Sequence, residues 1–242
     1  PVYSKRRVLY GLNLAKKSKR PNIILCEGNL DIVTLHQAGF DNAVASMGTA
    51  LTVEQTRLLS RFTKELVLCY DNDNAGKIAT ERALQILNGS EFSVKVLQLP
   101  RRLVDGEYIK QDADDFIKLQ GPDAFERLLN GSENGVEFRM AQIAGKYDLK
   151  DDEARIAYCG EVSELLASLP GAVEREIYTG RAAEAAGITA EAMKLEVQRS
   201  FKRRIAREKR AELRKNLNPA MALQPKERSL RFENMRSAEA EK

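Results

Sequence analysis

Short apolar runs alternate with helical patterns over the first half of the chain. Each run is four to seven residues long and is bounded by polar or turn-forming residues, which is typical of strands buried on both faces of a sheet. The predicted strands are residues 22–26, 43–46, 66–70 and 93–99. The segments between them have the spacing of helices: residues 30–38, a segment that begins with the capping box Thr52–Gln55, and residues 75–87.

This alternation predicts an α/β fold over residues 21–130. Strands joined through helices form a parallel sheet with right-handed crossovers, so helices are expected on both faces. Ligands of such folds bind beyond the carboxyl ends of the strands. Glu27 and Asp71 directly follow the first and third predicted strands. We therefore expect the functional site at that edge of the sheet.

The second half of the chain has a different pattern. After Gly131 the β-branched runs disappear and the sequence becomes helical in pattern, which predicts a small α-helical domain over residues 131–215. Its last helix is long and basic, with an apolar residue at every fourth position from Met193 to Ile205. Prolines and mixed charge from residue 216 onward predict a linker over residues 216–242.

Composition removes several classes of site. The chain has 242 residues, of which 43% are apolar and 31% charged, as is ordinary for a globular protein. It has no apolar run of ~18 residues and no signal-peptide core at its start, so we expect a cytoplasmic protein without a membrane partner. Its three cysteines are far apart and it has one histidine, which argues against disulfide, zinc-ribbon and histidine chemistry. Carboxylates are therefore the remaining candidates for a catalytic or metal-binding site.

The net charge of +4 hides a segregation along the chain. Residues 1–20 hold seven basic and no acidic residues, residues 21–193 hold 17 basic and 28 acidic, and residues 194–242 hold 15 basic and seven acidic. Basic ends suit phosphate backbones and an acidic centre suits divalent cations. Solvated charged faces explain the same counts equally well.

Three acidic clusters are candidates for a metal site: Glu27 with Asp31, Asp71 with Asp73, and residues 112–115. Carboxylates at positions i and i+2 can converge on one cation, and Mg²⁺ prefers oxygen ligands. Any single cluster is more simply explained by helix capping or by the helix dipole. Three clusters at one sheet edge repel one another unless a cation neutralises them, which favours a metal site.

The motifs around these clusters resemble a Toprim domain, specifically that of the DnaG-type primase family. They are Glu27-Gly28-Asn29-Leu30-Asp31, the block Gly39–Thr52 and Asp71-Asn72-Asp73-Asn74-Ala75-Gly76. Asp112-Ala113-Asp114 is similar to the Asp-Pro-Asp pattern of that family. The resemblance covers most of residues 1–130 and implies a Toprim-like, Rossmann-type parallel sheet. The chain departs from the family at Asn29-Leu30, Asn72 and Asn74, and its loop 101–111 is longer.

The resemblance also implies the roles of individual residues. Glu27, Asp71 and Asp73 correspond to the catalytic carboxylates, and Asp31, Asp112 and Asp114 complete the set that binds Mg²⁺ or Mn²⁺. Lys5 corresponds to a basic residue that lies beside the site and is a candidate ligand for nucleotide or nucleic-acid phosphate. Lys77, placed after the paired aspartates, is a second candidate, although a helix-surface role is the simpler explanation for it.

The activity implied is that of a DNA primase, which makes short RNA primers on single-stranded DNA from ribonucleoside triphosphates by metal-dependent nucleotidyl transfer. Residues 1–20 would end a basic N-terminal subdomain, zinc would belong to a module outside this chain, and the replicative helicase would bind through a missing C-terminal domain. Two alternatives stay open: a Toprim nuclease or topoisomerase fragment, and a non-catalytic nucleic-acid or helicase adaptor.

Overall fold

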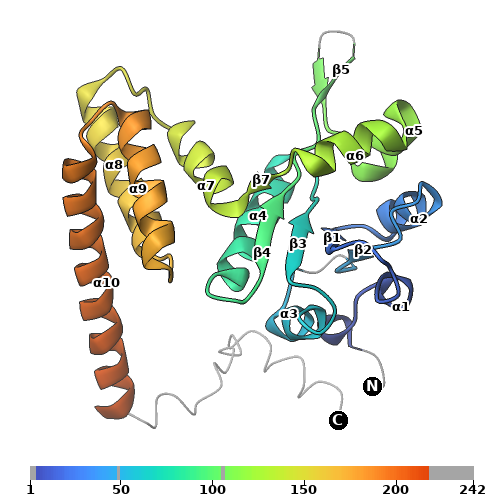
Figure 1. The fold of residues 1–242 in the computed structure, drawn as a ribbon, viewed down its shortest axis with the longest axis horizontal. Coiled ribbons are helices and arrows are strands. Elements are labelled where there is room, and N and C mark those ends of the chain that lie inside the picture. Colours follow the sequence, from blue (N-terminus) through green and yellow to red (C-terminus); the bar gives the residue numbers. More distant parts are fainter. Residues whose placement is uncertain (1–3, 48–49, 105–106, 218–242) are drawn as a thin grey trace, which may run out of the picture.

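The structure, a computed structural model, describes residues 4–47, 50–104 and 107–217 and confirms the α/β fold with an attached helical domain (Figure 1). Four strands pair in parallel: β1 (Asn22–Cys26), β2 (Ala43–Ala45), β3 (Glu65–Leu68) and β4 (Ser93–Val96). A two-residue strand, β7 (Glu133–Asn134), adds an antiparallel edge, so the order is β2-β1-β3-β4-β7. The order of the first four strands places β1 and β3 side by side.

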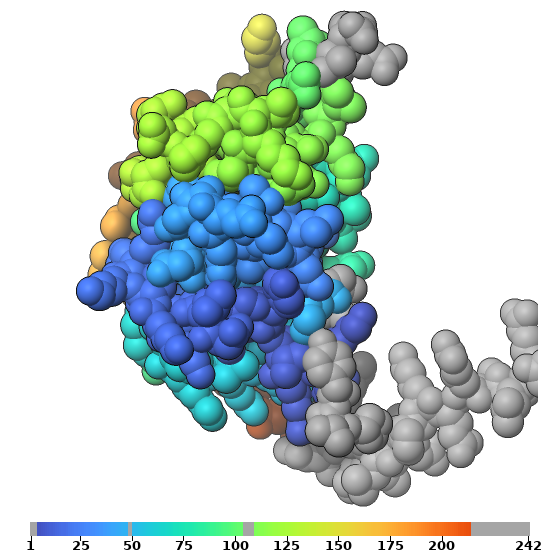
Figure 2. Space-filling view, turned by 90° about the vertical axis from the view of Figure 1, so that its right-hand side faces the viewer, coloured from blue at the N-terminus to red at the C-terminus, as the bar shows by residue number. Residues whose placement is uncertain are grey.

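Helices cover both faces of the sheet, as predicted. One face carries α2 (Asn29–Gln37), α5 (Ala113–Gln120) and α6 (Pro122–Asn130). The other carries α1 (Leu12–Ala15), α3 (Val53–Leu59) and α4 (Asn74–Leu87), and η1 (Lys5–Arg7) contacts α3. The alternation of β1 explains the two layers, because Ile24 and Cys26 pack into the first core while Ile23 and Leu25 pack into the second. Figure 2 shows α5 and α6 directly above α2 and the N-terminal segment on the outer surface.

The helical domain consists of α7 (Gly135–Ala144), α8 (Asp152–Ala167), α9 (Ala172–Ala186) and α10 (Ala190–Leu217). These helices enclose a third apolar core around Tyr158, Val162 and Met193. Helix α7 connects the two domains, because its Phe138 packs against the sheet while its Ile143 packs into the helical core.

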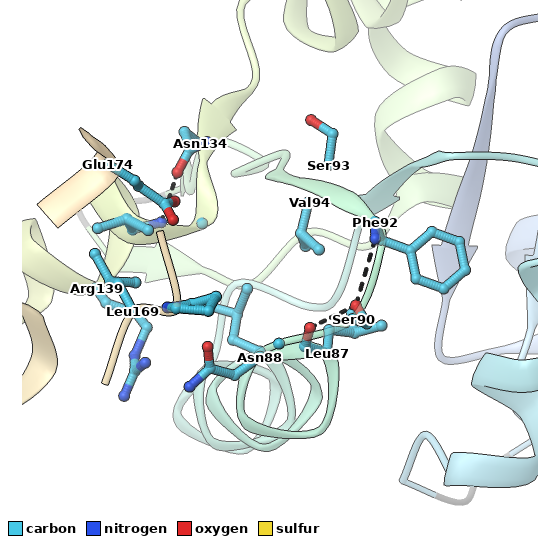
Figure 3. Close-up of a pocket in the computed structure, with 15 residues that line it drawn as sticks. Leu87, Asn88, Ser90, Phe92, Ser93, Val94, Asn134, Arg139, Leu169 and Glu174 are labelled. Carbon is cyan, nitrogen blue, oxygen red and sulfur yellow. Dashed lines mark hydrogen bonds between the residues drawn. The ribbon is translucent and has the colours of Figure 1, made fainter. Parts of the chain in front are cut away.

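A pocket of about 250 Å³ lies where the two domains meet (Figure 3). It is lined by the turn after α4, the start of β4, the start of α7 and the turn between α8 and α9. Ser93 and Val94, at the amino end of β4, border it. The pocket therefore lies at the end of the sheet opposite the acidic clusters, and we assign no chemistry to it.

Besides β7, two features of the sheet region differ from the prediction. The loop 101–111 contains a hairpin of β5 (Arg102–Val104) and β6 (Glu107–Ile109). Strand β4 is shorter than the predicted residues 93–99, because its neighbour β3 ends at Leu68, whose carbonyl accepts the last bond from Leu97 N at 2.9 Å. The predicted linker lies outside the described residues from 218 onward. Within the described part of the chain, no helix combines the length and apolar character needed to cross a bilayer.

Candidate metal centre

The acidic clusters lie on turns at the carboxyl edge of the sheet. Glu27 follows β1, and Asp71 and Asp73 follow β3. Strands β1 and β3 pair in parallel with Leu25 opposite Leu68, so these two turns are neighbours. The third cluster begins α5, which packs against α2 on the same side of the sheet. Segments 27–31, 71–73 and 112–115 therefore converge at one edge, as predicted.

The turn after β3 explains the spacing of Asp71, Asp73 and Gly76. Asp73 caps α4, and its Oδ1 accepts a hydrogen bond from Gly76 N at 2.8 Å. A Cβ atom on Gly76 would lie 2.0 Å from the carbonyl oxygen of Asp71, so only glycine fits. The first turn of α4 is thus packed directly on the backbone of Asp71. Asn72 donates from Nδ2 to the carbonyl of Leu99 and so connects the turn to the segment after β4.

Asp31 connects the first and third clusters. Its side chain is only 6% exposed. Oδ2 accepts a hydrogen bond from Gly28 N at 3.2 Å, and Oδ1 accepts one from Asp114 N at 3.3 Å. Asp31 therefore fixes both its own turn and the start of α5, which lies 83 residues further along the chain.

The third cluster is a compact group of carboxylates. Asp112 caps α5 by accepting from Asp115 N at 2.7 Å. One carboxylate oxygen from each of Asp112, Asp114 and Asp115 lies within 4.8 Å of the others. Asp114 also accepts hydrogen bonds from the Thr34 hydroxyl and from Lys118 Nζ, the latter at 2.6 Å. Asp115 belongs to the predicted acidic cluster, whereas Thr34 has no predicted role at the site.

Lys110 is a further residue that the sequence did not indicate. It follows β6, and its Nζ lies 3.4 Å from Asp71 Oδ2 and 3.7 Å from Asp73 Oδ2. The side chain is 60% exposed, whereas the two carboxylates are 24% and 33% exposed. An exposed lysine from the hairpin thus lies between the two paired aspartates.

Burial and mutual repulsion perturb the carboxylates. Burial, reinforced by the charges of Asp112 and Asp71, raises the pKa of Asp31 to about 6. Burial also raises the pKa of Glu27, and Asp71, Asp73 and Asp31 add to that increase. The pKa of Asp71 is likewise raised by burial, although Lys110 opposes the change. The site therefore carries more negative charge than its surroundings neutralise.

Two carboxylates have the opposite perturbation. The hydrogen bond from Gly76 N lowers the pKa of Asp73, and the hydrogen bonds from Lys118 and Thr34 lower that of Asp114. Glu27 Oε1 is buried and has no hydrogen-bond partner among the described residues. An unpartnered carboxylate oxygen beside several ionised carboxylates fits a hard divalent cation, which prefers oxygen ligands. The donor set therefore suits Mg²⁺ or Mn²⁺.

The two predicted phosphate ligands lie in η1 and in the first turn of α4. Lys5 is exposed in η1, where its carbonyl accepts a hydrogen bond from Gln55 Nε2 at 3.0 Å. Lys77 lies in the first turn of α4 and lines a groove of about 460 Å³ between α4 and α7. Within the described residues, neither lysine forms an ion pair with any of the six carboxylates.

Comparisons with known proteins find matches to both halves of the chain. The family described as Toprim-like matches residues 24–117, and the family described as the DnaB-helicase binding domain of primase matches residues 136–191. The DNA primase of Clostridium acetobutylicum is 36% identical over 193 residues, which cover 79% of this chain and 31% of the relative. The chain spans about a third of the length of the curated relatives that it matches.

Solved structures show the same fold. A DNA primase domain from Pseudomonas aeruginosa is similar with a TM-score of 0.66 and 29% identity, over 82% of this chain and 61% of that one. A DnaG primase catalytic domain bound to single-stranded DNA gives a TM-score of 0.64 with 29% identity, over 79% and 60% of the two chains. The chain therefore belongs to the family of DnaG-type DNA primases and carries the Toprim domain of that family.

Proposed function

We propose that this chain carries the nucleotidyl-transfer centre of a DNA primase, which extends an RNA primer on single-stranded DNA from ribonucleoside triphosphates. The observation that supports the proposal best is the convergence of Glu27, Asp71 and Asp73 with Asp31, Asp112 and Asp114 at one sheet edge. Divalent cations bound there would neutralise charge on the attacking and leaving oxygens of the transfer. Asp71 and Asp73 are assigned as cation ligands.

Glu27 is assigned as a further ligand or as the acceptor of the proton from the attacking 3′-hydroxyl. Its buried, unpartnered Oε1 is free to take either role. Its raised pKa brings the carboxylate closer to the working range of a general base. Asp31, Asp112 and Asp114 are assigned to complete the set of cation ligands. Asp31 also holds the start of α5, and Asp114 takes its orientation from Thr34 and Lys118. Lys5 and Lys77 stay candidates for phosphate contacts.

The proposed partners follow from the relatives. One structural neighbour is a DnaG catalytic domain bound to single-stranded DNA, which supports a single-stranded template. The match to the DnaB-helicase binding domain of primase covers α7 to α9, so we assign helicase contact to these helices. The resemblance in sequence places helicase contact in a missing C-terminal domain instead and implies no role for the helical domain. A cytoplasmic location and a zinc site outside this chain complete the proposal.

The competing functions are less well supported. A topoisomerase needs a tyrosine nucleophile, and Tyr70, which adjoins Asp71, is 6% exposed within the core that faces α3 and α4. Burial raises its pKa, which disfavours the phenolate further. A non-catalytic adaptor has no need for the buried, unpartnered Oε1 of Glu27 beside the charges of Asp71 and Asp73. This arrangement therefore counts against the adaptor. A nuclease would use the same carboxylates, so only an assay separates it from a primase.

The test begins with calorimetric titration of Mg²⁺ and Mn²⁺ into the chain and into the variant Asp71→Asn/Asp73→Asn. The matched control is Asp123→Asn/Asp152→Asn, which removes two exposed carboxylates elsewhere. We expect the first variant to lose binding and the control to retain it. The same substitutions in a full-length family member that contains this segment should abolish primer synthesis in the first case only. Metal binding without primer synthesis in the unaltered full-length protein would refute the primase assignment and favour the nuclease.

A further inference from the structure

Helix α10 extends beyond the core that it helps to form (Figure 1). Its first half packs on α8 and α9, with Met193 and Val197 buried. From residue 202 to residue 213 every side chain is exposed. The second half of α10 is therefore a solvent-exposed helix. The packing of the domain does not require the side chains that point away from it.

Charge is sorted around this exposed half. At ~100° per residue, the five bases Arg199, Lys202, Arg203, Lys209 and Arg210 fall within an arc of roughly 120°. The acidic residues Glu208 and Glu212 lie on the opposite side, together with the half-buried Phe201. The arc otherwise contains Ala206 and Leu213 and no acidic residue.

The bases of this outer face are only partly neutralised. Glu196, at the border of the arc, pairs with Arg199 at 3.2 Å and with Arg203 at 3.1 Å. Within the described residues, Lys202, Lys209 and Arg210 have no ion-pair partner. Like charges at helical spacing destabilise a helix slightly, so this arrangement does not serve the folding of α10.

Two bases of the exposed half lie outside this arc, Arg207 and Arg204, and Arg204 has a different role. Arg204 points toward the domain, where its Nη1 donates to the carbonyl of Ala167 at 2.8 Å and its Nε pairs with Glu208 at 2.8 Å. Arg175 lies over the ring of Phe201, with its guanidinium carbon 4.9 Å from the ring centre. These contacts fix the rotation of α10, so the outer face points away from the domain.

We propose that the outer face of α10, defined by Lys202, Lys209 and Arg210 with Arg199 and Arg203, binds the phosphate backbone of single-stranded DNA. The proposal rests on the proposed function, because the template of that reaction is a single strand. Lysine and arginine contacts to phosphates hold a strand without reading its bases. A membrane-surface helix would need a broad apolar face opposite the bases, and here that position holds Glu208 and Glu212.

The test measures binding of a fluorescent oligothymidylate to the whole chain by anisotropy at several salt concentrations, with a chelator present so that the metal centre does not contribute. The variant Lys202→Ala/Lys209→Ala/Arg210→Ala is compared with Lys64→Ala/Arg127→Ala/Lys150→Ala. Both variants remove three exposed positive charges, so they have equal net charge. Circular dichroism checks that α10 remains helical.

We expect the α10 variant to bind roughly ten- to a hundred-fold more weakly at low salt, with the slope of log affinity against log salt reduced by about 2, since each phosphate contact contributes ~0.7. The control should stay near the unaltered chain. Equal affinities and slopes in the two variants would overturn the proposal and leave α10 to an acidic protein partner. Unchanged Mg²⁺ binding by the α10 variant would show that its defect is separate from the proposed metal centre.

Discussion

Lys110 Nζ lies 3.4 Å from Asp71 Oδ2, although 39 residues separate the two positions in the sequence. The same ammonium group is 3.7 Å from Asp73 Oδ2. The lysine directly follows the β5–β6 hairpin. A positive charge of the chain itself thus lies where a divalent cation would neutralise the paired aspartates.

Replacement of Lys110 by methionine should tighten metal binding. A bound cation has to displace the ammonium group or tolerate its repulsion, and either process costs affinity. Because Lys110 is largely exposed, its pairing is a surface interaction of about 0.2–1 kcal/mol, which corresponds to an increase of about 1.5- to 5-fold in Mg²⁺ affinity. Calorimetry measures the change directly. Lys95→Met is the matched control, since Lys95 pairs with Glu65 at 3.2 Å in the body of the sheet. Unchanged or weaker Mg²⁺ binding by Lys110→Met would contradict the competition.

The buried Asp31 should make the metal-free protein less stable as pH rises. Its pKa is about 6 in the folded chain against an ordinary value of 3.8, so the folded state retains a proton that the unfolded state loses. Stability therefore falls between about pH 4 and pH 6 by up to about 3 kcal/mol from this group, and then levels off. Urea unfolding in the presence of a chelator at pH 4.5 and pH 7 measures the difference.

The variant Asp31→Asn isolates this contribution. It should show a smaller difference in unfolding free energy between the two pH values, although its absolute stability falls because one of the acceptors for Gly28 N and Asp114 N is lost. Glu27 and Asp71 have pKa values raised in the same direction and should keep part of the dependence. An identical pH dependence in Asp31→Asn and the unaltered chain would show that Asp31 titrates normally.

Metal should reverse the effect of pH. Cations bind the deprotonated carboxylates, so Mg²⁺ should raise the melting temperature more at pH 7 than at pH 5, as the carboxyl group of Asp31 loses its proton. A thermal melt with and without Mg²⁺ at each pH checks this. A stabilisation that does not depend on pH would mean that the perturbed carboxylates do not take part in binding.

Local pattern was sufficient to predict the main elements of the fold. The apolar runs gave β1 to β4 in order, and the capping box at α3 is confirmed, with Thr52 Oγ1 accepting from Gln55 N at 3.1 Å and Gln55 Oε1 accepting from Thr52 N at 3.0 Å. The position of the acidic turns followed from the strand ends, because parallel strands bring their carboxyl ends to one edge. The sequence therefore predicted both the sheet and the edge that carries the site.

The features that were missed depend on contacts between distant segments. Strand β7 has two residues and exists because β4 offers it an edge, which no local period can reveal. The three-residue strands of the β5–β6 hairpin are too short to show alternation. Lys110 reaches Asp71 because that hairpin returns the chain to the sheet edge. The pattern around Asp73 indicates either helix capping or metal binding, yet one oxygen is enough for the cap: Oδ1 caps α4 while Oδ2 faces Lys110.

Replacement of Gly76 by alanine should damage the centre without touching a carboxylate. The added Cβ would lie 2.0 Å from the Asp71 carbonyl oxygen, so either the start of α4 or the end of β3 has to move. We expect a loss of about 1–3 kcal/mol in the free energy of unfolding, as for other overpacked sites, together with at least a several-fold loss of Mg²⁺ affinity. Gly180→Ala, in α9, is the matched control because no atom lies within 4 Å of its added Cβ. If Gly76→Ala binds Mg²⁺ normally, the packing of α4 on Asp71 does not position the carboxylate.

Replacement of Thr34 by valine should release Asp114 while leaving its charge in place. The Thr34 hydroxyl of α2 donates to Asp114 Oδ1, and Lys118 holds the other oxygen at 2.6 Å. Valine keeps the shape of the side chain and removes the donor, so Asp114 should lose part of its fixed orientation and its pKa should rise toward the ordinary value. The carboxyl pKa can be followed by carbon-detected NMR titration, with Thr56→Val as the control, because the Thr56 hydroxyl donates only to the Thr52 carbonyl in α3. If the pKa of Asp114 does not change in Thr34→Val, Lys118 alone sets its ionisation, and Thr34 has no part in shaping the third cluster.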